Sequence, residues 1–219
     1  MTPNMKDDWN ERARENARFY IATSVDDADF DISGLRDVGN FFDRIEHLLH
    51  AEQDVLDIGC GIGRMDQFVA PRVRHLAGID VSGEMIRLAT ERMAKFQNVS
   101  YHEGDGRTLA PIADASIGLV FSHIVFQHMP RDVTSSYFIE VMRVLCPGGD
   151  FVFQVPEAVA DAPEDPPEDD TFEMRFYDEK QLQEQLLALG FAWLECRRYP
   201  VETPRLNFNQ LRIHVKRPL

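Results

Sequence analysis

The chain has 219 residues, of which 44% are hydrophobic and 27% are charged, so it can form one globular domain with a sizeable core and is neither disordered nor a disulfide scaffold. Its 23 Lys and Arg against 37 Asp and Glu give a formal net charge of -14, which argues against a protein that binds mainly by neutralising phosphates or anionic lipids. No apolar run reaches the roughly 18 to 20 residues that span a bilayer, and no secretory signal or cysteine pattern is present, so we expect a cytoplasmic protein without a membrane segment.

Short apolar runs alternate with amphipathic segments along the chain. Two helices with aromatic anchors are expected first, over residues 5–22 and 36–50. Five buried strands are expected next, over residues 55–58, 75–80, 99–104, 117–122 and 150–155. Helical patterns lie between or after these strands, over residues 64–69, 82–96 (with Ser82 as its cap), 133–145 and 179–189. This alternation predicts a doubly wound α/β fold, with right-handed crossovers and a parallel sheet covered on both faces.

The last part of the chain has a different pattern. Residues 191–200 and 209–218 are two strand-like runs with no helix between them, so they should pair antiparallel at one edge of the sheet. The expected fold is therefore a seven-stranded, mostly parallel sheet with an antiparallel edge hairpin.

Half of the net charge lies in one short segment. Residues 157–170 contain seven acids, three prolines and no base. Since like charges repel and prolines remove hydrogen-bond donors, we expect an extended, mobile loop, with a role as a lid or in acceptor binding as the alternative. Just after it, Arg175 is expected to pair with the loop's own carboxylates rather than with an acidic ligand.

The most informative segment is the glycine loop, which we define as residues 59–63. A buried strand runs directly into Gly59, Gly61 and Gly63, and a short helix follows. Glycines let the backbone approach a ligand closely, and the start of a helix offers free N–H groups, so this loop predicts a small-molecule site. The spacing is GxGxG rather than the dinucleotide pattern GxGxxG, and no Walker lysine follows.

Acidic residues also stand at the ends of the next strands. Asp80 lies 19 residues after Gly61, where a carboxylate can accept both hydroxyl groups of a ribose. Asp105 closes the third strand. Because ligands of open α/β sheets bind at the carboxyl ends of the strands, we expect Asp57, these two acids and the glycine loop to converge on one crevice.

The segments VLDIGCGIG, GIDVS, GDGRTL, IGLVFSHIVFQHMP and LCPGGDFVF, found in this order between residues 52 and 155, resemble class I S-adenosylmethionine (SAM) dependent methyltransferases. The resemblance implies a single methyltransferase domain over residues 1–219. Its parts would be an N-terminal helical cap over the cofactor site, a SAM-binding core, an acidic flexible insertion, and a C-terminal helix with edge strands, over residues 1–50, 51–155, 156–174 and 175–219.

The resemblance also implies how the cofactor is held. The methionine part of SAM would be surrounded by Asp57, Gly59, Cys60, Gly61 and Gly63, with Cys60 as a small loop residue rather than a nucleophile. The remaining cofactor contacts would come from Asp80 at the ribose, Val81 and Met85 beside the adenine, Asp105 and Gly106 at the adenine amine, Ser122 facing the sulfonium, and Tyr20 from the N-terminal cap.

A histidine is the expected general base, because it titrates near neutral pH and can take the proton that an oxygen acceptor loses. His123, near the end of the fourth strand, is the first candidate, and His128 is the second, with a structural or lid position as its alternative. Five residues on a helix separate two side chains by about 140°, so these two should not share a cavity or a metal ion. No metal site is expected.

The expected function is methyl transfer from SAM to an O, N or C atom of a small-molecule acceptor. An RNA or protein methyltransferase is an alternative that the basic C-terminal strand permits, although the overall charge makes a nucleic-acid partner unlikely. An NAD-dependent oxidoreductase would share the sheet and the ribose acid, and a SAM-binding protein without catalysis would share every motif. The acceptor and the oligomeric state are not predicted.

Overall fold

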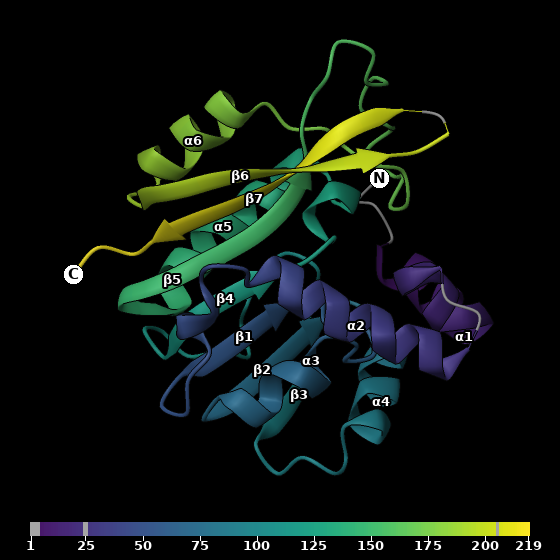
Figure 1. The fold of residues 1–219 in the computed structure, drawn as a ribbon, viewed down its shortest axis with the longest axis vertical. Coiled ribbons are helices and arrows are strands. Elements are labelled where there is room, and N and C mark those ends of the chain that lie inside the picture. The colour runs from purple at the N-terminus through teal and green to yellow at the C-terminus, as the bar shows by residue number, and fades with distance from the viewer. Residues whose placement is uncertain (1–4, 24–25, 205) are drawn as a thin grey trace. The chain divides into compact units, whose positions relative to one another are not determined.

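The computed structural model describes residues 5–23, 26–204 and 206–219 (Figure 1). One sheet of seven strands runs in the order β3-β2-β1-β4-β5-β7-β6, which confirms the predicted fold class. The residues fall into two compact units, an N-terminal unit that ends at Gly106 and a C-terminal unit that begins at Arg107. We describe each unit separately. No helix among the described residues is long and apolar enough to cross a membrane.

The N-terminal unit holds the first three strands, which pair in parallel. Its elements are α1 (Met5–Ala22), α2 (Asp27–Phe41), η1 (Glu46–Leu48), β1 (Asp54–Ile58), α3 (Asp66–Val69), η2 (Ala70–Arg72), β2 (His75–Asp80), α4 (Gly83–Arg92) and β3 (Val99–Glu103). In the register, Asp57 of β1 faces Gly78 of β2, and Gly78 faces Tyr101 of β3. These three residues therefore lie side by side across the sheet.

The second helix differs from the prediction. We expected it over residues 36–50, but α2 runs from Asp27 to Phe41 and only the short η1 follows. Its start is set by Asp26, whose side chain accepts a hydrogen bond from Asp29 N at 2.8 Å. Its buried face includes Phe30, at 0% exposure. The many acids around this start hid the cap, because they are typical of a solvated loop.

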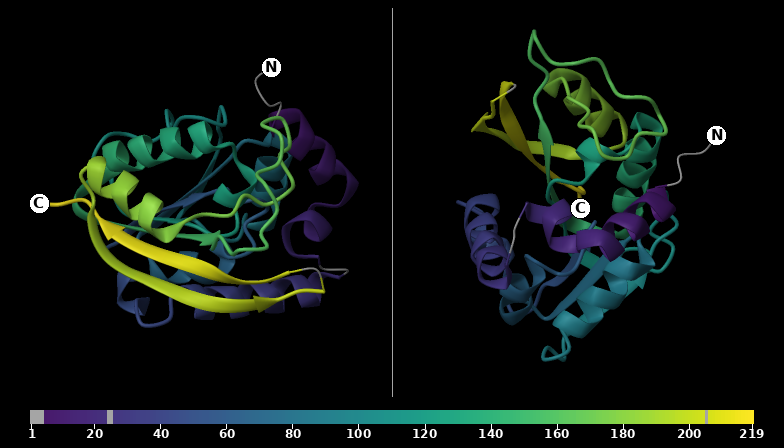
Figure 2. Two further views of the ribbon diagram at one scale, coloured as in Figure 1. Left: turned by 90° about the horizontal axis from the view of Figure 1, so that it is seen from above. Right: turned by 90° about the vertical axis from the view of Figure 1, so that its right-hand side faces the viewer.

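The C-terminal unit contains the other four strands. Its elements are β4 (Ile117–Ser122), η3 (Phe126–His128), α5 (Arg131–Val144), β5 (Leu145–Pro156), α6 (Glu179–Ala188), β6 (Ala192–Glu202) and β7 (Asn207–Lys216). β4 and β5 pair in parallel, whereas β7 pairs antiparallel with both β5 and β6, so the predicted edge hairpin is confirmed. Figure 2 shows α6 running along this long hairpin.

The strand β5 begins five residues earlier than the run of apolar residues indicated. The chain leaves α5 directly into extended backbone at Leu145, and Gly148 takes a φ of +77°. The pairing with β4 shifts register between Ile117 and Leu119, which accommodates the irregular start. Glycines and a proline at residues 147–149 concealed this part of the strand.

Aromatic rings form the core of the C-terminal unit. Four fully buried phenylalanines contact one another with ring centroids 4.7 to 6.2 Å apart: Phe126, Phe138, Phe151 and Phe153. Phe126 belongs to η3, so this cluster fixes the turn that follows β4 against α5 and β5.

The acidic insertion, residues 156–174, has little regular secondary structure and is anchored at several points, while its predicted mobility stays a prediction. Its two ends are joined by a bridge between Glu157 and Tyr177. Arg175, only 2% exposed, donates to the carbonyl oxygens of Pro167 and Asp170, both at 2.9 Å. Arg175 thus bonds to carbonyl groups in place of the predicted ion pair. Such bonds satisfy a buried guanidinium without the cost of desolvating a second charged group.

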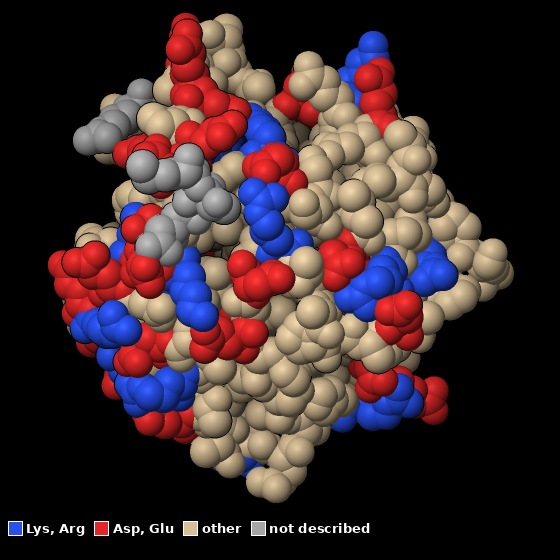
Figure 3. Space-filling view, turned by 180° about the vertical axis from the view of Figure 1, so that it is seen from behind, with Lys and Arg blue, Asp and Glu red and all other residues tan. Residues whose placement is uncertain are grey.

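Charged side chains of both signs stand among wide areas of uncharged residues on the face shown in Figure 3. On the face shown in Figure 3, basic side chains lie scattered among acidic ones rather than gathered into a patch. The described residues on that face therefore form no basic patch of the kind that binds polyanions.

Candidate functional site

The glycine loop has the backbone conformation that its glycines permit. Gly59, Gly61 and Gly63 have φ values of +77°, +53° and +74°, in the left-handed region that other residues rarely adopt. A Cβ atom built at Gly61 would lie 2.8 Å from Cδ1 of Ile21 in α1. The loop is therefore closely packed, and its backbone N–H groups at Gly59, Cys60 and Gly63 donate to backbone carbonyl oxygens of Ile79 and Cys60.

Asp80 holds the glycine loop in place. Its Oδ2 accepts a hydrogen bond from Gly61 N at 3.0 Å, and its Oδ1 accepts one from Ser82 N at 2.9 Å. Burial raises the pKa of the Asp80 carboxyl to about 6, although the backbone N–H donors favour the ionised form. A carboxylate at the end of β2 is therefore joined to the loop at the end of β1, as the topology predicts.

The N-terminal helix α1 lies over this loop and over the start of α4. Asn10 Oδ1 accepts from Ser82 Oγ at 2.8 Å and from Glu84 N at 3.1 Å, and Ser82 is the predicted cap of α4. Apolar residues of α1, α2, the loop and α4 form one buried cluster: Ala13, Ala17, Phe30, Ile62 and Met85. Met85 is therefore packed in this cluster, with 1% exposure.

The other residues of the N-terminal unit that were predicted to contact the cofactor lie near Gly106 and on α1. A Cβ at Gly106, whose φ is +80°, would lie 3.1 Å from both Met5 Cε and Val81 Cγ2, so Gly106 and Val81 are neighbours. Asp105 is exposed beside them. Tyr20 donates from its hydroxyl to Glu15 of the same helix at 2.7 Å, and its predicted contact with the cofactor stays a prediction.

Buried acids beneath the loop are the main feature that sequence reasoning missed. Asp66, the first residue of α3, is 0% exposed and accepts from the hydroxyl of Tyr101 at 2.8 Å. Burial raises the pKa of Asp66 and raises that of its neighbour Asp57 well above the ordinary value. The same effect raises the pKa of the Cys60 thiol, which argues against a nucleophilic role. The sequence signal that could have indicated this buried group is Gly78, because a glycine in the middle of a strand often marks a place where another group packs closely against the backbone.

Arg64, the residue after the last glycine, was also not predicted. It is 5% exposed, and its Nη1 donates to Asp37 Oδ2 at 2.7 Å and to Ser33 Oγ at 3.1 Å, both on α2. Its carbonyl oxygen would lie 2.5 Å from a Cβ at Gly34. The loop is therefore fixed from the α2 side as well.

In the C-terminal unit, Ser122 ends β4 as a fully buried residue, and His123 follows it in a turn. Ile124 has a φ of +59°, so the helical geometry that we used to separate His123 from His128 does not apply. His128 lies in η3, with Nδ1 2.6 Å from the carbonyl oxygen of Phe172 and its ring stacked on that of Phe172. The insertion thus holds His128, in line with the structural or lid alternative, and the catalytic role of either histidine stays a prediction.

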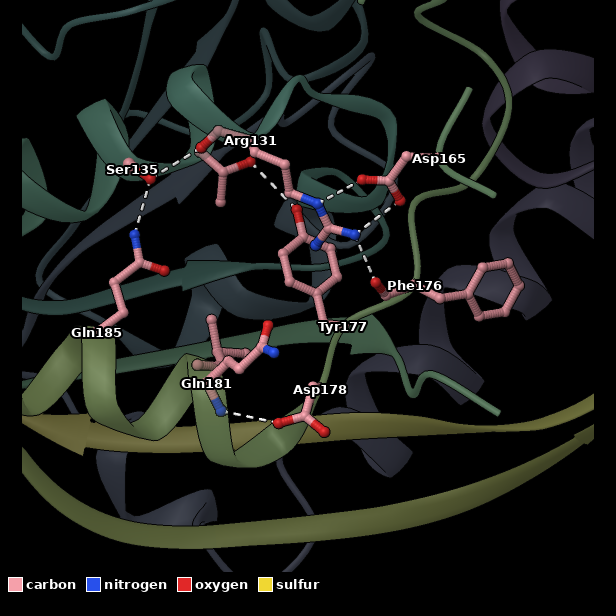
Figure 4. Close-up of a pocket in the computed structure, with 10 residues that line it drawn as sticks. Arg131, Ser135, Asp165, Phe176, Tyr177, Asp178, Gln181 and Gln185 are labelled. Carbon is pink, nitrogen blue, oxygen red and sulfur yellow. Dashed lines mark hydrogen bonds and ion pairs between the residues drawn. The ribbon is translucent and has the colours of Figure 1, made fainter. Parts of the chain in front are cut away.

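A pocket of about 390 Å³ lies between α5, α6 and the insertion (Figure 4). The guanidinium of Arg131 lies 4.0 Å from the ring centre of Tyr177 and donates from Nε and Nη2 to the two oxygens of Asp165, each at 2.8 Å. Gln185 donates to Ser135 at 2.7 Å on the opposite wall. The charge of Arg131 is therefore matched within the chain, and the walls of the pocket are formed by polar side chains together with Phe176 and Leu182.

Comparisons with known proteins show which proteins this chain is similar to. A family model described as "Methyltransferase domain" matches residues 55–149. A probable SAM-dependent methyltransferase of Mycolicibacterium smegmatis is 29% identical over 166 residues, covering 73% of this chain and 62% of the relative. A demethylmenaquinone methyltransferase of Tropheryma whipplei is 33% identical over 47% of this chain. The chain spans about 41% of the length of that relative.

Solved structures share the fold. A methyltransferase-like structure from Bacillus halodurans has a TM-score of 0.67 and 18% identity, covering 84% of this chain and 100% of the other. The cyclase SpnF has a TM-score of 0.69 and 18% identity, covering 82% and 80%. At this identity the likeness shows the fold alone.

Proposed function

Because the chain belongs to the class I SAM-dependent methyltransferases, we propose that it transfers the methyl group of SAM to a small-molecule acceptor. The observation that carries the proposal is the bond from Gly61 N to Asp80, which joins a glycine loop in left-handed conformation to an acid at the end of the next strand. This arrangement places a carboxylate at the end of β2 against the loop at the end of β1, which is where ligands of open α/β sheets bind.

The residues present fit this cofactor. The glycines allow the loop its left-handed backbone conformation, and the carboxyl groups of Asp57, Asp66 and Asp80 gather at the loop, which suits a ligand that carries a positive charge. Bound SAM would supply a methyl group already activated by a positively charged sulfur. The chain's own task is then to bind through the loop backbone, to orient the ribose through Asp80, and to exclude water with α1.

The acceptor is proposed to bind at the residues that follow β4. Ser122 and His123 end that strand, and His128 connects the next turn to the acidic insertion. We assign His123 as the first candidate for removing a proton from the acceptor. The matched relatives include a phosphoethanolamine N-methyltransferase of Caenorhabditis elegans and an arsenite methyltransferase of Halobacterium salinarum, which supports a small acceptor.

Calorimetry with SAM and its product S-adenosylhomocysteine tests the cofactor assignment, using Asp80→Asn against the matched surface variant Asp43→Asn. We expect both ligands to bind the wild-type protein and Asp43→Asn, and Asp80→Asn to bind at least about tenfold more weakly, since a charged hydrogen-bond acceptor is worth about 1.5 to 3 kcal/mol. Equal affinities for the two variants would overturn the role of Asp80. Methyl transfer from labelled SAM to a panel of small molecules, compared with RNA and protein, tests the acceptor class.

Two further predictions accompany this proposal. That residues 1–219 act as a single methyltransferase domain and that the protein is cytoplasmic both stay predictions from the sequence.

A further inference from the structure

A tyrosine reaches across the sheet beneath the glycine loop. Asp57, Gly78 and Tyr101 are aligned on three neighbouring strands, and the Tyr101 hydroxyl donates to Asp66 Oδ2 at 2.8 Å. A Cβ at Gly78 would lie 2.5 Å from Tyr101 Cε1, so only glycine leaves room for the ring. A Cβ at Gly63 would lie 2.9 Å from the Tyr101 hydroxyl. The hydroxyl therefore lies directly under the loop.

The second carboxylate oxygen of Asp66 lacks an ordinary donor. Asp66 is 0% exposed, and among the described residues no donor is bonded to its Oδ1. Its neighbour is the Asp57 carboxyl, which is 5% exposed and lies within hydrogen-bonding reach. Two adjacent carboxylates in a dry site cannot both stay ionised, so a proton on Asp57 would supply the missing donor.

The groups around this pair do not neutralise it. Arg64 is a cation that lowers the pKa of Asp57, but its guanidinium is already bonded to Asp37. Asp80 adds a third negative group, and Cys60 and Tyr101 stay protonated because burial raises their pKa values. Burial, followed by the charge of Asp66, raises the pKa of Asp57 well above its ordinary value. The pair therefore keeps one proton in the free protein.

We propose that the Tyr101–Asp66–Asp57 chain stores one proton beneath the glycine loop, and that binding of a sulfonium cation expels it whereas binding of the neutral-sulfur product does not. This inference rests on the proposed function. The O–H bond of Asp57 breaks heterolytically, its electron pair stays on the carboxylate, and the proton passes to the solvent. The site would thus gain a negative charge when the ligand brings a positive one, and Tyr101 is a positioning residue that keeps Asp66 in its ionised form.

Proton release can be counted by calorimetry in two buffers with different ionisation enthalpies. At about pH 6.5 the α-amino groups of both ligands stay protonated, so the difference between them reports on the sulfonium. We expect SAM to release about half a proton or more beyond the product in the wild-type protein. We expect Asp66→Asn to abolish this difference, because the charge of Asp66 no longer raises the pKa of Asp57 and the new amide N–H can donate to the ionised Asp57 carboxylate. Equal release by the two ligands, or a difference unchanged in Asp66→Asn, would overturn the proposal.

Tyr101→Phe tests the positioning role. Removing the donor to Asp66 raises the proton affinity of the pair, so SAM affinity should fall most at low pH and approach the wild-type value as the pH rises. A merely structural loss would lower the affinity by the same factor at every pH and would refute the role. Tyr137→Phe, a buried tyrosine of α5, is the matched control and should leave the pH profile unchanged.

Infrared spectroscopy of the free protein separates this inference from the proposed function. We expect a C=O stretch from a protonated carboxyl group that disappears in Asp66→Asn. If SAM fails to bind while this band is present, the proposed function is wrong and the stored proton stands. If the band is absent while SAM binds, the stored proton is wrong. Should Asp66→Asn fail to fold, the pH profile of Tyr101→Phe decides.

Discussion

Replacing Gly78 by alanine should strongly destabilise the protein, although alanine usually stabilises a strand relative to glycine. The new Cβ would lie 2.5 and 2.6 Å from Cε1 and Cδ1 of Tyr101 and 3.0 Å from Cys60 Sγ. Such overpacking costs about 1 to 3 kcal/mol. Moving the ring also removes the donor to Asp66, a bond to a charged group worth about 1.5 to 3 kcal/mol, against which alanine gains only about 0.5 to 1 kcal/mol of backbone entropy.

We therefore expect Gly78→Ala to lower the free energy of unfolding by about 2 to 5 kcal/mol, measured by urea denaturation with an unchanged m-value. Gly39→Ala is the matched control, because it lies in α2 and its Cβ would meet nothing within 4 Å. That variant should be more stable than the wild type by about 0.5 to 1 kcal/mol. If Gly78→Ala is as stable as the wild type, the ring does not lie across β2 and the reasoning fails.

Three further variants test other parts of the account. Burial raises the pKa of the Asp66 carboxyl above its ordinary 3.8 on folding, so the folded state binds the proton more tightly, and stability is lost as the pH rises from about 4 to 7. Asp66→Asn should lose less over that range in urea denaturation, and parallel pH profiles would contradict this. Arg175→Gln should cost about 2 to 4 kcal/mol and speed proteolysis within residues 158–174, because two carbonyl groups lose a buried donor. Asp165→Asn breaks only a half-exposed pair with Arg131 and should cost less than about 1 kcal/mol; a larger loss would show that this pair anchors the insertion.

Much of the fold could be predicted because its strands are short apolar runs that end in polar residues. The strands over residues 75–80 and 117–122 were predicted with the observed limits, since Asp80 and Ser122 end them. The start of α2 was missed because its cap stands among acids, and the start of β5 was missed because glycines occupy it. At both places the local composition is typical of a loop, and it led to a wrong start for the element.

The candidate site was predictable only where it depends on topology. The meeting of Asp80 with the glycine loop follows from the rule that parallel strands end at one edge. The bond between Tyr101 and Asp66 depends on which residues face one another across three strands, and a single sequence does not contain that register. The contact between His128 and the insertion could not be predicted either, because the partner is the backbone carbonyl of Phe172 and every residue type has such a carbonyl.

The central claim is that the glycine loop and Asp80 form a SAM site, and a titration of the purified protein with SAM, followed by calorimetry, tests it most directly. We predict saturable binding to one site that Asp80→Asn weakens by at least about tenfold and Asp43→Asn leaves unchanged. Absence of binding to the folded wild-type protein, or undiminished binding to Asp80→Asn, would contradict it.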